Sequence, residues 1–171
     1  MSYSEGHPVR PVGGRLALDF VNTADWTANA DVAHEKLNSL ADLDVWLRAL
    51  QIEARCGCTL DQLKSLRSDL RAMFLEAKSS ETLNAVRELD FGTPAETPLL
   101  LEGLLAASAI SILTDPREHG RLKMCPGDNC GWLFIDETRN SRRTWCSMES
   151  CGNRAKAARH YQRTRKSTVS R

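Results

Sequence analysis

Four cysteines near the C-terminus constrain this 171-residue chain more than any other feature of its sequence. They form two pairs, with four residues inside each pair and fifteen residues between the pairs: Cys125, Cys130, Cys146 and Cys151. Each short loop can direct both of its thiolates to one ion, and the longer loop can bring the two pairs together. The spacing therefore predicts a tetrahedral four-cysteine zinc site. The residues inside the first pair are Pro, Gly, Asp and Asn, which are typical of turns.

Four thiolates fill the coordination shell of Zn²⁺, so such an ion is structural and offers no open position for catalysis. One zinc ion would replace much of the missing core in a module of about 40 residues with few apolar side chains. Its aromatic and apolar residues are expected to pack around the ion: Trp132, Phe134, Ile135, Trp145 and Met148. Four free thiols are the alternative. The N-terminal residues contain no run typical of a signal peptide, which favours the reducing cytoplasm over disulfides.

The net charge of +1 hides a strong asymmetry between the two ends of the chain. Residues 121–171 carry 12 Lys and Arg against four Asp and Glu, a net +8, whereas residues 1–120 carry 11 against 18, a net −7. This asymmetry indicates an anionic partner for the basic end, with nucleic acid as the first candidate and an anionic membrane surface as the second. The most apolar window, residues 99–113, is too short to span a bilayer, and we expect no membrane insertion.

Apolar residues recur at helical intervals through the first two thirds of the chain. The predicted helices lie within residues 37–54, 59–77, 81–89 and 99–113. Ser39 can cap the first, and Thr59 with Gln62 can form a capping box for the second. The last is apolar almost all round and is expected at the centre of a bundle. Residues 13–23, GGRLALDFVNT, can form either a strand or a short helix.

The composition changes after Pro116 towards Arg, Lys, Cys and Trp. We therefore predict a mainly α protein with two parts. Residues 1–117 form a helical domain, and residues 118–171 form a small four-cysteine zinc module with a short hairpin or knuckles and a basic helix.

Residues 152–166 predict that basic helix, because they are rich in good helix formers. At about 100° per residue, one side is a basic strip that includes His160. Its side chains can reach phosphates or guanine edges if the helix lies in a major groove. Arg154 lies off the strip and can either brace the module or touch DNA, and three arginines between the cysteine pairs can add backbone contacts. The candidate DNA-binding residues are Arg139, Arg142, Arg143, Arg154, Lys156, Arg159, Arg163 and Lys166. A solvated basic face is the alternative.

The segment Cys-Ser-Met-Glu-Ser-Cys-Gly-Asn-Arg at residues 146–154, preceded by Arg-Thr-Trp, closely resembles the CGNR zinc-finger family. The resemblance also rests on Cys125, Cys130, Phe134 and Asp136. GGRLALDFVNT and the helical region after it are similar to the ABATE-type domain that accompanies this finger in stress-induced bacterial transcription regulators. The resemblance implies zinc on the four cysteines and a DNA-binding role in a bacterial cytoplasmic protein.

Two smaller groups leave alternatives open. Asp19, Asn22 and Thr23 can line a pocket for a small-molecule effector, or Asn22 and Thr23 can simply cap a helix. Cys56 and Cys58 can form a redox pair, but no base is evident near them in the sequence, and two incidental thiols are the simpler interpretation.

The leading hypothesis is a DNA-binding transcription regulator whose helical domain senses a ligand or mediates self-association. A homodimer fits this hypothesis, because one small DNA-binding module buries only about 600 to 1,000 Å². A zinc-stabilised adaptor that binds protein is the alternative. An enzyme in the N-terminal domain is a remote alternative. The sequence contains no catalytic or nucleotide-binding motif, and we therefore expect no enzyme.

Overall fold

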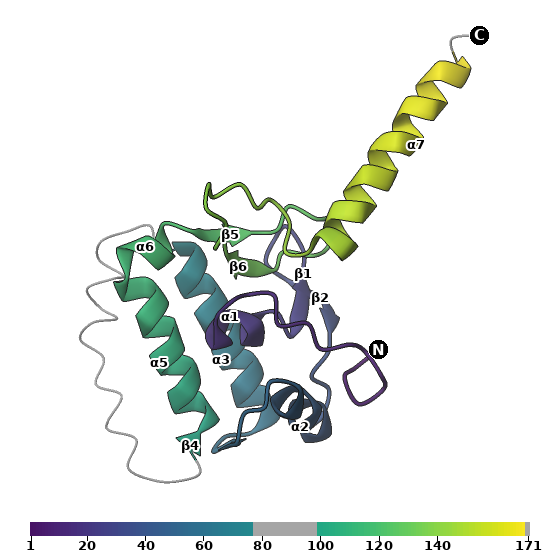
Figure 1. Ribbon diagram of the computed structural model, residues 1–171. Coiled ribbons are helices and arrows are strands. Elements are labelled where there is room, and N and C mark those ends of the chain that lie inside the picture. Colours follow the sequence, from purple (N-terminus) through teal and green to yellow (C-terminus); the bar gives the residue numbers. More distant parts are fainter. Residues whose placement is uncertain (77–98, 170–171) are drawn as a thin grey trace.

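Helices form about half of the computed structural model, which describes residues 1–76 and 99–169 (Figure 1). The helices are α1 (Leu16–Val21), α2 (Leu40–Ala49), α3 (Leu60–Glu76), α5 (Leu101–Thr114), α6 (Pro116–His119) and α7 (Asn153–Val169). A π-helical turn, η1 (Met148–Gly152), leads directly into α7. The predicted mainly α fold is confirmed; the helix expected at residues 81–89 lies outside the described residues.

Three small two-stranded sheets connect these helices. The strands are β1 (Ala24–Trp26), β2 (Val32–Glu35), β3 (Ala54–Arg55), β4 (Leu99–Leu100), β5 (Leu122–Met124) and β6 (Leu133–Ile135). β1 pairs with β2, and β5 with β6, in antiparallel fashion, whereas β3 and β4 are parallel. The β5–β6 pair is the short hairpin expected in the zinc module.

The central element is α1, so the segment GGRLALDFVNT contains a short helix and not a strand (Figure 1). It is buried from Ala17 to Val21 and packs against α3, α5 and β6. Because this helix is so short and packs against several elements, its apolar residues contact neighbours whatever their spacing. Their spacing in the sequence therefore does not distinguish a helix from a strand. The expectation that the apolar α5 occupies the centre is wrong, because α5 buries one face and exposes Gly103, Ala107 and Ser111.

Both predicted helix caps are confirmed. The Ser39 hydroxyl accepts a hydrogen bond from the Asp42 backbone N–H at 3.2 Å, and the Asp42 carboxylate accepts from the Ser39 N–H at 2.8 Å. At α3, the Thr59 N–H donates to the Gln62 side chain at 2.8 Å, and the Gln62 N–H donates to the Thr59 hydroxyl at 3.3 Å. Each box satisfies two amide groups that the first helical turn leaves without partners.

The zinc module packs directly against the helices, and one continuous core crosses the predicted boundary at residue 117. The Ile135 N–H donates to the Gly13 carbonyl at 2.9 Å, and the Trp132 indole N–H donates to the Ala24 carbonyl at 3.0 Å. The four residues from Trp132 to Ile135 are all buried. The aromatic side chains expected around the zinc ion therefore also fill the junction with the helical part. The division at residue 117 stays a prediction.

Candidate functional site

The four predicted ligand cysteines meet at the base of α7, beside the β5–β6 hairpin. Each is 2% to 5% exposed, and their Sγ atoms all lie within 4.8 Å of one another. The Sγ atoms of Cys130 and Cys146 are 3.6 Å apart, and those of Cys146 and Cys151 are 3.7 Å apart. A tetrahedron with zinc–sulfur bonds of about 2.3 Å has edges of about 3.8 Å. The cluster fits one structural Zn²⁺ ion, which the four thiolates would hold.

Tight backbone turns bring the cysteines together. The Cys130 N–H donates to the Gly127 carbonyl at 3.1 Å, which closes the first loop. A Cβ atom at Gly127 would meet the Cys151 Sγ at 2.9 Å, so only glycine lets the two loops approach this closely. Asn129 and Gly131 then take positive φ angles of 46° and 56°, which turn the chain back into β6.

Crowding couples the ionisation of the thiols. Hydrogen bonds from Cys130 and Cys146 lower the pKa of Cys125 to about 2. Hydrogen bonding to Cys125 raises the pKa of Cys130 to about 12, and hydrogen bonds to Cys125 and Cys130 also raise the pKa of Cys146. Four sulfur atoms this close together cannot all ionise without a cation, so some of them keep their protons. A divalent ion replaces those protons and allows all four sulfurs to ionise.

Arg154, in the first turn of α7, lies against the sulfur cluster. Its Nη2 donates to the Cys151 Sγ at 3.0 Å, and this bond raises the pKa of the guanidinium. A cation here offsets the excess negative charge of four thiolates around one Zn²⁺ ion. The contact supports the bracing role among the two roles considered for Arg154. Met148, expected to pack on the ion, is 52% exposed, and Trp145 is only partly buried.

The Arg143 guanidinium is engaged inside the fold. It donates to the carbonyls of Trp145 at 3.1 Å and Val12 at 2.9 Å, and also to the Cys146 carbonyl. Its Cζ lies 4.3 Å from the centre of the Phe134 ring. Arg143 therefore connects the zinc module to the N-terminal segment, which leaves its guanidinium little freedom to reach DNA.

Asp136 organises the loop between the cysteine pairs, a role that sequence reasoning missed. Its fully buried carboxylate accepts from the Lys123 ammonium at 2.5 Å and from the backbone N–H groups of Thr138 at 3.0 Å and Arg143 at 2.8 Å. Burial by itself raises the pKa of Asp136, but these hydrogen bonds outweigh it and lower the pKa below its ordinary value. The Asp-x-Thr spacing is the only local signal of this turn. Beyond it, Arg139 and Arg142 are exposed on the loop.

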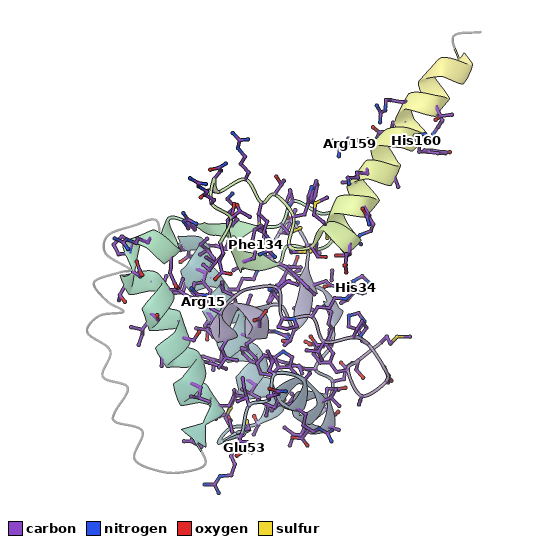
Figure 2. All side chains as sticks on the ribbon, viewed as in Figure 1. Arg15, His34, Glu53, Phe134, Arg159 and His160 are labelled. Atoms are coloured by element: carbon purple, nitrogen blue, oxygen red, sulfur yellow. The ribbon has the colours of Figure 1, made fainter. Side chains whose placement is uncertain are left out.

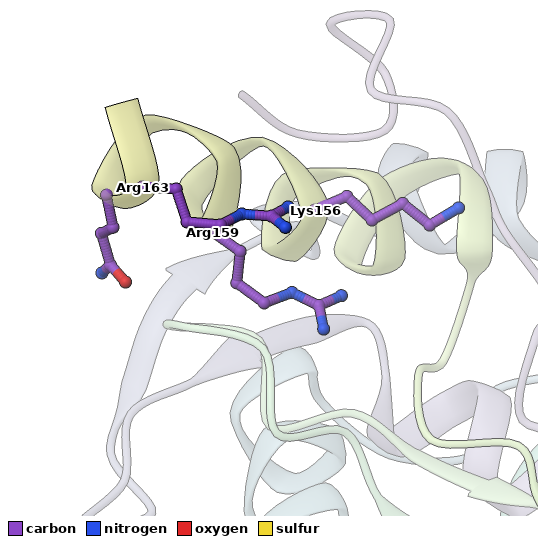
Figure 3. A pocket seen from close by; sticks show the side chains of 4 residues that line it. Lys156, Arg159 and Arg163 are labelled. Atoms are coloured by element: carbon purple, nitrogen blue, oxygen red, sulfur yellow. The ribbon is translucent and has the colours of Figure 1, made fainter. Parts of the chain in front are cut away.

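α7 projects from the zinc site as a free arm (Figure 1). Residues 156–165 are all exposed, and Arg159 and His160 stand clear of the body (Figure 2). A groove of about 530 Å³ lies along one side of the helix, lined by Lys156, Arg159, Gln162 and Arg163 (Figure 3). Three members of the predicted strip thus share one side. Lys166 lies in α7, but its side chain is outside the described residues.

The three residues considered for an effector pocket bond within the fold. Asn22 caps the C-terminus of α1, and its amide donates to the Leu133 carbonyl at 2.8 Å and accepts from the Leu133 N–H at 2.9 Å. The Thr23 hydroxyl donates to the Phe20 carbonyl at 2.7 Å. Asp19 accepts from the Gly13 N–H at 2.7 Å, and burial raises its pKa to about 6. These contacts support the capping interpretation of Asn22.

The fold and the site define a mainly helical protein with a C-terminal structural zinc finger. The model of the CGNR zinc finger matches residues 121–164, and the model of the ABATE family, described as "Putative stress-induced transcription regulator", matches residues 14–116. The chain therefore belongs to the ABATE family and carries a CGNR zinc finger. Neither is an enzyme family. No curated protein matches the chain.

Within the described ranges, every helix is too short or too polar to span a lipid bilayer.

Proposed function

We propose that this protein is a cytoplasmic bacterial regulator of transcription in stress responses, and that it binds DNA through α7. The observation that carries the proposal is the exposed, uniformly basic surface of this helix. α7 contains six Lys and Arg residues and no Asp or Glu, and it projects from the module that holds the four-cysteine cluster (Figure 1). If these basic residues served only to keep the helix in contact with solvent, the helix would not need to project from the fold or to start at a metal site.

The shape of α7 fits a major groove. Its 17 residues extend for about 25 Å, and a groove about 12 Å wide admits a helix of this diameter. Lys156, Arg159 and Arg163 lie on one side and can neutralise phosphates or donate to guanine edges. Arg139 and Arg142 can contact the DNA backbone nearby. We leave Arg143 out of the proposed interface because its guanidinium bonds inside the fold, and we assign Arg154 to the zinc site.

The helical part has a separate role in this proposal: it senses a small-molecule effector or holds two copies together. A homodimer would double the contact area of a single small module and would read a two-fold symmetric site. Membership of the ABATE family supports a regulatory role for this part of the chain.

A salt titration of binding to a pool of short genomic duplexes tests the proposal. Arg159→Ala with Arg163→Ala should weaken binding at least tenfold and reduce the slope of log affinity against log salt concentration by about 2. The α-helix tolerates both alanines, and the zinc content should stay the same. Arg48→Ala with Arg55→Ala is the matched control, because it removes two exposed arginines and the same charge elsewhere.

Equal binding by the two double variants would remove α7 from the interface. If zinc-loaded wild-type protein binds no duplex even at low salt, the DNA-binding role is wrong. The adaptor that binds an acidic protein surface would then become the better explanation of the basic arm.

A further inference from the structure

A second group of metal-ligating side chains lies far from the zinc finger, at the opposite end of α5 (Figure 1). It consists of Cys56, Cys58 and Glu102, with one ligand atom of each within 4.8 Å of the others. The two Sγ atoms are 3.6 Å apart. All three residues are partly exposed, so an ion can enter from solvent.

The fold brings these residues together although Gly57, between the two cysteines, and Glu102 are 45 positions apart in sequence. β3 and β4 pair in parallel, with Ala54 opposite Leu99, and this places the loop after β3 beside the first turn of α5. The Gly57 N–H donates to Glu102 Oε1 at 2.8 Å and orients the carboxylate. A Cβ atom at Gly57 would lie 3.2 Å from the same oxygen, so the glycine permits this close approach.

The other carboxylate oxygen of Glu102 has no hydrogen-bond partner among the described residues, although it is buried. An unpaired buried carboxylate oxygen is costly unless a proton or a cation accompanies it. A bound cation would relieve this cost, because it would pair with the free carboxylate oxygen.

We propose that Cys56, Cys58 and Glu102 form a second zinc site with three protein ligands and one open position. Two thiolates favour Zn²⁺ over hard ions such as Mg²⁺ and Ca²⁺, and a carboxylate is an ordinary third ligand for zinc. The open position and partial exposure make this ion exchangeable, unlike the buried ion of the four-cysteine site. The ion would tie the loop before α3 to the start of α5.

Metal counting on the full-length, reduced protein tests the proposal. Wild-type protein should bind two equivalents of Zn²⁺, and Cys56→Ser with Cys58→Ser should bind one. In a Co²⁺ titration, the second equivalent should add thiolate-to-cobalt charge-transfer absorption that the double variant lacks. Glu102→Gln should weaken the second equivalent at least tenfold. Glu53→Gln, which changes an exposed carboxylate on the segment that leads into β3, should leave both equivalents unchanged.

The four-cysteine site provides an internal reference for folding. Each variant should still bind the first equivalent of Zn²⁺ at this site, and its helix content should not change. One equivalent in reduced wild-type protein would overturn the proposal. A second equivalent that survives both the double serine variant and Glu102→Gln would also overturn it, because the ion would then lie elsewhere.

Discussion

Several polar side chains in this protein are buried or partly buried where the helices meet the zinc finger, and each has a defined partner. Asn22 bonds both backbone groups of Leu133, Asp136 closes the loop between the cysteine pairs, and Arg143 donates to four carbonyl groups. Such contacts cost little while every group is paired, but removal of one partner leaves others unsatisfied in a water-poor interior. Single substitutions here should therefore affect stability more than function.

Asn22→Ala should lower the free energy of unfolding by about 3 kcal/mol, because it leaves the buried N–H and carbonyl of Leu133 without partners. Chemical denaturation of zinc-loaded protein measures this loss. Asn29→Ala is the control, because Asn29 is exposed and should change stability by less than about 0.5 kcal/mol. A similar, small effect of both substitutions would show that the Asn22 bridge contributes little.

Asp19→Asn should stabilise the protein near pH 7.5 by about 2 kcal/mol. Burial raises the folded-state pKa of Asp19 to about 6, above its unfolded value, so the folded protein binds the extra proton between about pH 4 and pH 6. The stability of the wild type therefore falls as the pH rises through this window, whereas the neutral asparagine escapes that loss.

The advantage of Asp19→Asn should shrink as the pH falls from 7.5 to 5. Unfolding midpoints of both proteins, measured at equal zinc content across this range, give the comparison, and Asp31→Asn at an exposed site serves as the control. An advantage that stays constant with pH would contradict the raised pKa.

At the scale of whole elements, the sequence predicts those helices and caps that are determined by residues close together in the chain. The caps at Ser39 and Thr59, the stripe of α3 and the basic α7 all depend on spacings of three or four positions, and the structure contains each of them. The cysteine pairs are similarly informative, since loop length alone restricts which thiolates can share an ion.

Features that depend on distant residues were not predictable in this way. Five of the six residues of α1 are buried against α3, α5 and β6, so burial and not periodicity decides their conformation. Glu102 approaches Cys56 only because β3 pairs with β4, and Arg143 reaches Val12 only because the hairpin packs on α1. In each case the deciding partner is tens of residues away in sequence.

The proposed binding of DNA should change the dynamics of α7. An isolated helix of about this length is only marginally stable in water, and residues 156–165 are exposed on all sides. Their amide hydrogens should exchange rapidly in the free protein and become at least tenfold slower to exchange in a complex with DNA. Hydrogen exchange followed by mass spectrometry measures this, with the buried α1 as the reference that changes little. Binding of DNA without added protection in α7 would place the contact surface elsewhere.

Among the described residues, one continuous core joins the helices to the zinc finger, so we expect zinc to stabilise both parts. Trp132 to Ile135 are buried against the helices, and Gly131 accepts a hydrogen bond at 2.6 Å from Arg71 of α3. The loop that holds Cys125 and Cys130 also positions these residues. Loss of the ion should therefore disorder the contact surface on which α1 and α3 depend, and its effect should extend beyond the finger.

Removal of zinc with a strong chelator under reducing conditions should lower the thermal midpoint of the whole helical signal by at least about 10 °C, in a single transition. Far-ultraviolet circular dichroism follows the helices, and hydrogen exchange shows whether α1 loses protection together with the β5–β6 hairpin. The Cys56→Ser, Cys58→Ser variant, treated identically, separates the four-cysteine ion from an ion at the second site. If α1 keeps its protection while the hairpin loses it, the two parts are energetically independent despite their shared core. A common loss instead means that the zinc finger sets the stability of the helical part, so that metal supply would govern both the proposed DNA binding and the proposed sensing.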